Sequence, residues 1–252
     1  MAERIGIIQS RGLGDIVIAL PIAGYYRDQG LEVYWPIGES FWPSVKDSAP
    51  WVHWIPIPED HGPFFYEVPS QRLKNFKVTN TVCLYQSLSS HPEFQDRPEC
   101  QITGFDQIKY HIAGVPFLNK WRLAEYITRD PEREQALSRR LRDGRPYAIM
   151  HLNGSDHTAE FDPSIIPEDW QIIEIKDQTN CIFDWLSLLE GAEVIVAVDS
   201  VIANLVDQLG INKDVDCYFI PRSHIQLTPV LGNPWTVVDP GATVAQRIRI
   251  FR

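Results

Sequence analysis

The chain has 252 residues, which is enough for one large domain or two small ones. With 44% hydrophobic and 22% charged residues, it has a globular composition, which excludes disorder over most of its length. The formal net charge of −10 excludes a uniformly basic nucleic-acid-binding surface, although it leaves a local basic groove open. No apolar run approaches the ~18–20 residues that span a bilayer, and we expect a cytoplasmic protein without a signal peptide or membrane span.

The potential metal ligands are scattered. The four cysteines form no CxxC pair and are predicted to be free thiols: Cys83, Cys100, Cys181 and Cys217. His151 and His157 lie six residues apart, without the fixed spacing of a helical metal site. We therefore predict neither a bound metal nor a resident cofactor.

The first half of the chain alternates short apolar runs with helical stretches. We predict strands at residues 5–8, 31–35, 52–55 and 81–85, and helices at 15–29 and 105–113. This order is typical of a parallel sheet covered by helices.

The second half repeats the alternation after a charged helical segment at residues 130–144. We predict strands at 147–152, 171–175, 194–198, 217–220 and 235–238, and helices at 183–190, 200–209 and 243–251. The sequence thus predicts an α/β fold with two Rossmann-like domains, residues 1–130 and 131–252.

The first motif is Gln-Ser-Arg-Gly-Leu-Gly-Asp, which follows the first strand and opens the first helix. Gly12 and Gly14 allow a tight turn and close approach to a ligand, while Asp15 either caps the helix or faces that ligand. The third glycine of a dinucleotide fingerprint is replaced by Val17, which disfavours an NAD-linked oxidoreductase. Pro21 is expected to kink or restart the helix.

Two further motifs follow strands of the second half. Asp199, Ser200 and Val201 open a helix whose amides form a potential anion site, suitable for a diphosphate. The alternative is that Asp199 or Ser200 only caps that helix. Residues Asn153, Gly154 and Ser155 form either a nest of amides around a phosphate or an ordinary turn.

Three stretches together resemble the heptosyltransferase-like glycosyltransferases, those of family 9, which have the GT-B architecture. They are IGIIQSRGLGDIVIALPIAGYYRDQG from residue 5, YAIMHLNGS from residue 147, and FDWLSLLEGAEVIVAVDSVIANLVDQLG from residue 183. These stretches cover about a quarter of the chain, and the Gly-x-Gly-Asp sequence with a proline six residues later is the most specific feature. The resemblance implies two Rossmann-like domains that face each other across a cleft.

The resemblance also implies an activity: metal-independent, inverting transfer of a sugar from a UDP- or ADP-linked donor to an acceptor hydroxyl. Asp15 occupies the position of the family's proposed general base, and Asp199 and Ser200 occupy that of the turn that holds the donor diphosphate. The N-terminal domain would bind the acceptor and the C-terminal domain the nucleotide sugar. The acceptor stays open between a glycan, a lipid-linked sugar and a hydroxylated nucleobase in DNA.

Such a reaction needs a cation at the leaving diphosphate and contacts for both substrates. Arg222 follows a predicted strand end and is the first candidate for this cation; Lys176 and His157 are the second choices. The alternative for Arg222 is a surface position without such a role. The loop that begins at Lys176 would recognise the base and ribose. Arg11 is placed at a substrate phosphate or the acceptor, and Trp42 either stacks on the acceptor or packs in the core.

The chain departs from the family pattern at two places. Val201 stands where the family has a glycine, without the histidine that usually follows, and the family's lysine has no match at residues 156–160. The alternative function is therefore a degenerate GT-B module that binds a nucleotide or a partner without transfer.

Overall fold

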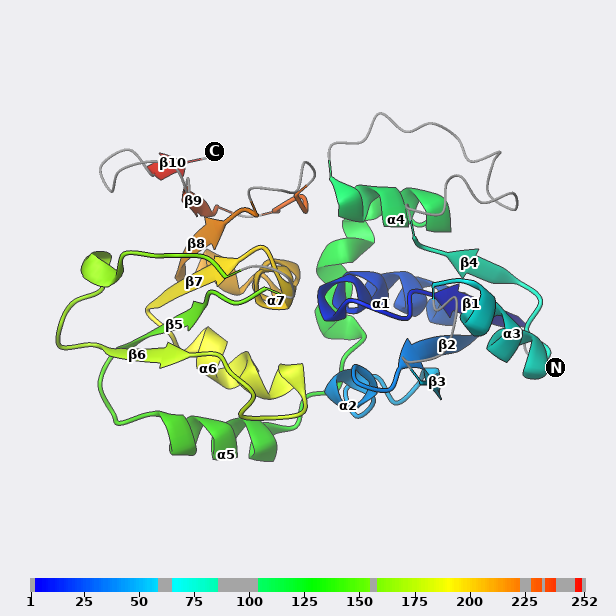
Figure 1. Ribbon diagram of the computed structural model, residues 1–252, viewed down its shortest axis with the longest axis horizontal. Helices are drawn as coiled ribbons and strands as arrows, with labels where there is room; N and C mark the ends of the chain where they lie inside the picture. The colour runs from blue at the N-terminus through cyan, green and yellow to red at the C-terminus, as the bar shows by residue number, and fades with distance from the viewer. Residues whose placement is uncertain are drawn as a thin grey trace. The chain divides into compact units, whose positions relative to one another are not determined.

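The computed structural model describes residues 3–58, 65–85, 104–154, 158–222, 228–232 and 234–238, and the backbone of 248–250. The chain divides into two compact units, Met1–Thr128 and Arg129–Arg252, each built on its own sheet (Figure 1). The first unit ends at Thr128, against residue 130 in the sequence prediction. Parallel strands with helices between them confirm the predicted α/β class.

Unit 1 contains a four-stranded parallel sheet in the order β3-β2-β1-β4. Its strands are β1 (Arg4–Ile8), β2 (Glu32–Gly38), β3 (His53–Ile57) and β4 (Thr81–Cys83). Its helices are α1 (Leu13–Asp28), α2 (Trp42–Val45), α3 (Glu67–Asn75), α4 (Phe105–Ala113) and the 3₁₀ segment η3 (Phe117–Glu125). Because β1 and β4 are adjacent and parallel, the residues that follow them meet at one edge of the sheet.

Helix α1 is the most deeply buried helix segment of unit 1. Its residues from Ile16 to Gly24 are all buried, which explains why the sequence shows an almost continuous apolar run there. The helix begins at Leu13 rather than at Asp15 and continues through Pro21, so the predicted restart does not occur.

Unit 2 contains a six-stranded sheet in the order β10-β9-β8-β7-β5-β6. Its strands are β5 (Tyr147–His151), β6 (Gln171–Glu174), β7 (Val194–Val198), β8 (Asp216–Ile220), β9 (Thr236–Val238) and β10 (Ile248–Ile250). Its helices are α5 (Pro131–Leu141), α6 (Leu186–Glu190) and α7 (Val201–Leu209), with 3₁₀ segments η4 (Pro163–Ile165), η5 (Ile182–Trp185) and η6 (Ile211–Lys213). Strands β5, β7 and β8 are neighbours, so their carboxyl ends lie together.

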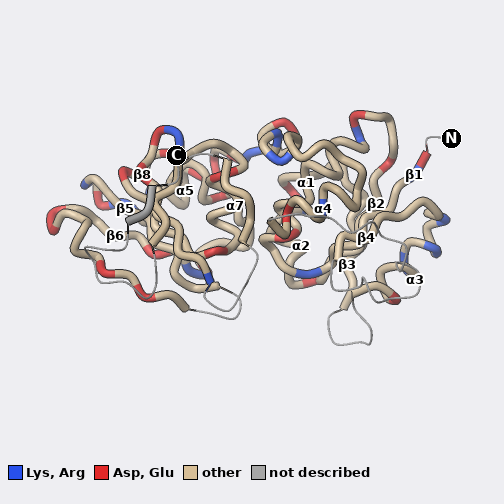
Figure 2. The backbone as a smooth tube through the Cα atoms, turned by 90° about the horizontal axis from the view of Figure 1, so that it is seen from above, with Lys and Arg blue, Asp and Glu red and all other residues tan. Residues whose placement is uncertain are grey.

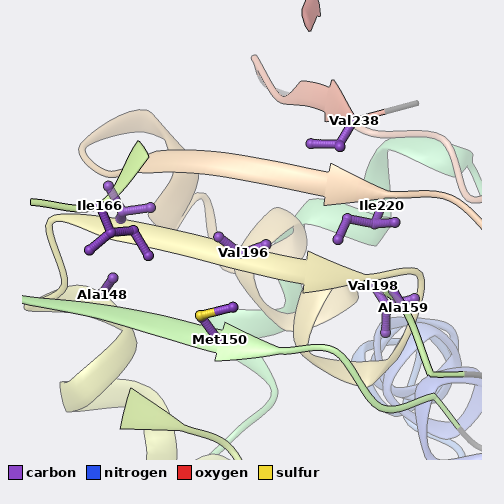
Figure 3. Close-up of a cluster of buried hydrophobic side chains, with 9 residues drawn as sticks. Ala148, Met150, Ala159, Ile166, Val196, Val198, Ile220 and Val238 are labelled. Atoms are coloured by element: carbon purple, nitrogen blue, oxygen red, sulfur yellow. The ribbon is translucent and has the colours of Figure 1, made fainter. Parts of the chain in front are cut away.

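One face of this sheet carries a continuous apolar cluster, drawn in Figure 3. Alternate residues of the strands contribute to it, as the two-residue period of a strand requires: Ala148, Met150, Val194, Val196, Val198, Ile220 and Val238. Ala159 and Ile166 cover this cluster from the segment between β5 and β6, whose described residues contain the short η4 and no α-helix.

Two predicted helices differ in the structure. The helix predicted at 183–190 is divided into η5 and α6. The closing helix predicted at 243–251 is wrong where the structure describes it, because Ile248–Ile250 is a strand that pairs antiparallel with β9. The sequence Ile-Arg-Ile has the two-residue alternation of a strand, and pairing with β9 satisfies its backbone. Within the described residues, no helix combines the length and apolar character needed to cross a membrane.

Candidate active site

Asp15 lies in the first turn of α1, at the carboxyl end of the unit 1 sheet. Gly12 is the N-cap residue, and no side chain caps this helix, so the Asp15 carboxylate is not used as an N-cap. Gly12 has a φ of 78°, and a Cβ atom there would lie 2.5 Å from Asp15 Oδ2. Glycine is thus needed at position 12 for two reasons: the backbone has a positive φ there, and a side chain would collide with the Asp15 carboxylate. Gly14 forms part of the same helical turn.

Lys109, on α4, is the counter-ion of Asp15 and a residue that the sequence interpretation missed. Its Nζ lies 2.9 Å from Asp15 Oδ1, and its side chain is only 7% exposed against 37% for Asp15. The same ammonium donates to Gln9 Oε1 at 2.8 Å and to the Leu84 carbonyl at 3.4 Å. The lysine therefore joins the ends of β1 and β4 to the carboxylate.

Arg11 lies at the exposed rim of this edge. Its backbone N–H donates to the Tyr85 hydroxyl at 2.9 Å, and its guanidinium lies 5.8 Å from the centroid of the Phe65 ring. Tyr85 is buried, and its hydroxyl also shares a hydrogen bond with Ser10; burial raises the pKa of Tyr85 to about 12. Arg11 is thus held beside Asp15 by its backbone, while its charged end stays exposed.

Trp42 opens the short helix α2 and is partly buried. The ammonium of Lys46 lies 4.8 Å from the centroid of its ring. No contact joins Trp42 to Asp15 or Lys109 among the described residues, so an acceptor role for Trp42 stays a prediction.

Ser200 and His151 form a pair at the carboxyl ends of β7 and β5. Ser200 is the N-cap residue of α7, but its side chain does not cap the helix; its hydroxyl shares a hydrogen bond with His151 Nδ1 at 2.9 Å. Val201 is the first residue of α7. The simple capping alternative for Ser200 is thus incorrect, and the N-terminal turn of α7 has no side-chain cap.

Asp199 and Arg222 lie beside this pair, at the ends of β7 and β8. Asp199 is 1% exposed, and its Oδ2 lies 3.8 Å from Arg222 Nε, whose side chain is 17% exposed. Arg222 is therefore not an ordinary surface arginine. The structure brings four side chains together at three adjacent strand ends: His151, Asp199, Ser200 and Arg222.

Of the other residues predicted in this half, the structure describes Asn153, Gly154 and Lys176. Asn153 accepts a hydrogen bond from the Thr158 hydroxyl at 3.1 Å and forms an isolated antiparallel bridge with Thr158. Ser155 and His157 lie outside the described residues. Lys176 lies beyond the edge strand β6, exposed, with its Nζ 2.6 Å from Glu174 Oε2.

His151 is expected to make the stability of the protein pH-dependent. Burial lowers the pKa of His151 from 6.5 to about 4, so the folded protein resists protonation that the unfolded chain accepts. The stabilisation is complete above about pH 6.5 and is lost as the pH falls through about 4. Denaturant unfolding near pH 7 and near pH 4.5 should show that the wild type loses about 2–3 kcal/mol more than His151→Gln. An equal loss in both proteins would contradict this assignment.

Potential metal ligands do not cluster in the part of the chain that the structure describes. No group of three or more His, Cys, Asp or Glu side chains there is arranged to hold a metal ion. Cys83, Cys181 and Cys217 are buried thiols.

Comparison with known proteins gives matches in structure but not in sequence. No protein-family model matches the chain, and no curated protein matches it in sequence. A family 9 glycosyltransferase from Veillonella parvula has 9% identity and a TM-score of 0.59, with 94% of this chain and 85% of that one covered. The ADP-heptose LPS heptosyltransferase II of E. coli has 13% identity and a TM-score of 0.54, covering 94% and 90%.

A third similar structure is that of the E. coli heptosyltransferase WaaC with ADP-2-deoxy-2-fluoro heptose, at 12% identity and a TM-score of 0.53. The match covers 93% of this chain and 92% of that one. At such low identities the likeness concerns the fold. The chain therefore shares the two-unit α/β fold of the heptosyltransferases, as the sequence resemblance predicted.

Proposed function

We propose that the chain is a glycosyltransferase that moves a sugar from a nucleotide-diphosphate donor to an acceptor hydroxyl, with inversion and without a metal. The observation that carries the proposal is the Asp15 carboxylate, which is partly exposed at a strand end and held on one oxygen by the buried Lys109. The shared fold of heptosyltransferases adds support, since an ion pair alone would not indicate a reaction.

In this proposal Asp15 is the general base of unit 1. It accepts the proton of the acceptor hydroxyl while the hydroxyl oxygen forms a bond to the anomeric carbon of the donor. The bond from that carbon to the diphosphate oxygen breaks on the opposite side, and the nucleoside diphosphate leaves with the electron pair. The configuration at the anomeric carbon is thereby inverted.

Unit 2 would hold the donor and stabilise the charge of the leaving group. The amides of the first turn of α7 lie at the positive end of the helix, which favours an anion, and Arg222 supplies a nearby cation. Two of the similar structures contain an ADP-linked heptose or its fluoro analogue, so an ADP-linked sugar is our first donor. The turn at Asn153 and Gly154 and the segment from Lys176 are proposed for the remaining donor contacts.

The acceptor is proposed to be a glycan or a lipid-linked sugar rather than DNA. A DNA acceptor requires a basic channel. Figure 2 shows Lys and Arg interspersed with Asp and Glu in both units. Four arginines in or near α5 are engaged within the protein: Arg133 with Asp184, Arg140 with the Gln178 carbonyl, Arg142 with the Tyr147 ring and Arg145 with Asp143.

The test combines binding with turnover. Calorimetric titration with ADP and UDP, followed by release of nucleoside diphosphate from ADP-heptose, separates the proposed functions. Binding together with turnover supports the transferase. Binding without turnover favours the degenerate nucleotide-binding module, and a response to NAD alone would contradict both.

Arg222→Ala is expected to lower the affinity for ADP about 10- to 100-fold, because a charge-assisted contact to the diphosphate is lost. Arg145→Ala is the matched control, since it removes an exposed arginine of the same unit that is paired with Asp143. Calorimetry should find the affinity of the control unchanged. Equal affinities in the two variants would remove Arg222 from the donor site.

A further inference from the structure

Lys109 is a buried cation whose three hydrogen-bond donors all have partners. An ammonium has three N–H donors, and here the acceptors are Gln9 Oε1, the Leu84 carbonyl and Asp15 Oδ1. The first two are neutral groups at the ends of β1 and β4 and fix the ammonium from the protein side. The third donor is thereby aimed at the carboxylate.

Gln9 is itself held in place, so the ammonium rests on a rigid support. The side-chain amide of Gln9 donates to the Arg11 carbonyl at 2.9 Å. The backbone carbonyl of Gln9 accepts from the Trp35 indole N–H at 3.0 Å. Gln9 and Trp35 are both buried. Their burial limits the freedom of Lys109 and, through it, that of Asp15.

Both oxygens of the Asp15 carboxylate have defined positions. Oδ1 accepts from Lys109, and Oδ2 lies against Gly12, where a Cβ atom would come within 2.5 Å. The side chain is 37% exposed, so without Lys109 nothing that the structure describes would hold its rotamer. A general base works only when it lies within hydrogen-bond reach of the proton it accepts.

We propose that Lys109 is the positioning residue of Asp15: held by Gln9 and the Leu84 carbonyl, it fixes the carboxylate in the orientation used for proton transfer. The inference rests on the proposed function for its effect on turnover. The inference also predicts the orientation of the Asp15 side chain, and this orientation can be measured in a protein without activity.

The competing explanation is purely structural, because Lys109 also joins α4 to the sheet. The chain offers a matched control on the same helix. Asp106 of α4 forms a fully buried ion pair with Lys120, with 2.8 Å between Oδ2 and Nζ. The double variant Asp106→Leu/Lys120→Met alters the packing of α4 and leaves Asp15 untouched.

The kinetic experiment compares Lys109→Met, Lys109→Arg and the Asp106→Leu/Lys120→Met control with the wild type, using ADP-heptose as donor. In Lys109→Met, kcat should fall about 10- to 100-fold while the donor KM stays the same, because a displaced base slows the proton transfer and not the binding. Lys109→Arg should recover part of the loss. A wild-type kcat in Lys109→Met, or an equal loss in the control, would overturn the inference.

Crystal structures of the wild type and Lys109→Met give the second measurement. Asp15 should have one rotamer in the wild type and more than one, or another one, in the variant. If Asp15 keeps the same single rotamer without Lys109, the inference is wrong whatever the activity. If the wild type has no turnover, the proposed function fails, and the rotamers still decide whether Lys109 positions Asp15.

Discussion

Asp15→Asn is expected to abolish sugar transfer, with turnover about 10²–10⁴-fold below that of the wild type. Asparagine has nearly the same shape as aspartate, but its amide cannot accept the proton that the acceptor hydroxyl loses. The donor contacts assigned to unit 2 are unchanged, so the affinity for ADP should stay at its wild-type value. Release of ADP from ADP-heptose measures the first quantity, and calorimetry measures the second.

The control for this variant is Asp28→Asn, on the same helix. The Asp28 side chain is 38% exposed, nearly as much as Asp15, and contacts Arg27, Arg122 and the Tyr126 hydroxyl. It lies at the opposite end of α1, so its loss should leave turnover close to wild type. Turnover in Asp15→Asn equal to that of the Asp28→Asn control would show that Asp15 is not the base.

The elements at the candidate site could be predicted from the sequence because their patterns are local. The all-apolar run at β7 and the helix after it match the prediction within one residue, since a buried parallel strand and a helix opened by Ser200 have short-range signals. Asp15 was identified from the Gly-x-Gly-Asp motif at the start of a helix, and Arg222 as a charged residue shortly after a strand. Such arguments identify which strand end carries a side chain, but not which partner the side chain meets.

Lys109 was missed because its contacts are distant in the sequence. Lys109 donates to Gln9, which is 100 positions away in the sequence, and to Leu84, which is 25 positions away. One local signal was available: the buried face of α4 consists of Asp106, Lys109, Tyr110 and Ala113, at helical spacing. Two charged residues on the buried face of a short helix indicate partners elsewhere in the fold.

His151 shows the same limit in unit 2. From the sequence, His151 was predicted to lie at the end of a strand and was considered only as a metal ligand. In the structure it shares a hydrogen bond with Ser200, which is 49 positions away. Strand order decides this contact, because β5 and β7 are neighbours in the sheet although β6 separates them in the chain. Strand order in a parallel sheet is a tertiary property that apolar periodicity does not encode.

Asp106→Asn is expected to produce the largest loss of stability in unit 1. Asp106 and Lys120 are both fully buried, and the Phe117 and Trp121 rings lie within 6 Å of the lysine ammonium. Removal of the negative charge leaves the buried ammonium of Lys120 without the Asp106 carboxylate. The free energy of unfolding of unit 1 should fall by about 3–5 kcal/mol.

Hydrogen exchange can measure this change separately in the two units, because each has its own sheet. Amides of β1 and β2 should lose protection in Asp106→Asn, while those of β5 and β7 should not and serve as the internal reference. The double variant Asp106→Leu/Lys120→Met removes both charges, so most of the protection should return, since a buried ion pair can often be replaced by apolar side chains at little cost. If Asp106→Asn costs less than about 1 kcal/mol, the pair is not a major determinant of stability. If the double variant is no more stable than the single one, the loss comes from packing rather than from an uncompensated charge, and the variant could not serve as the control for Lys109.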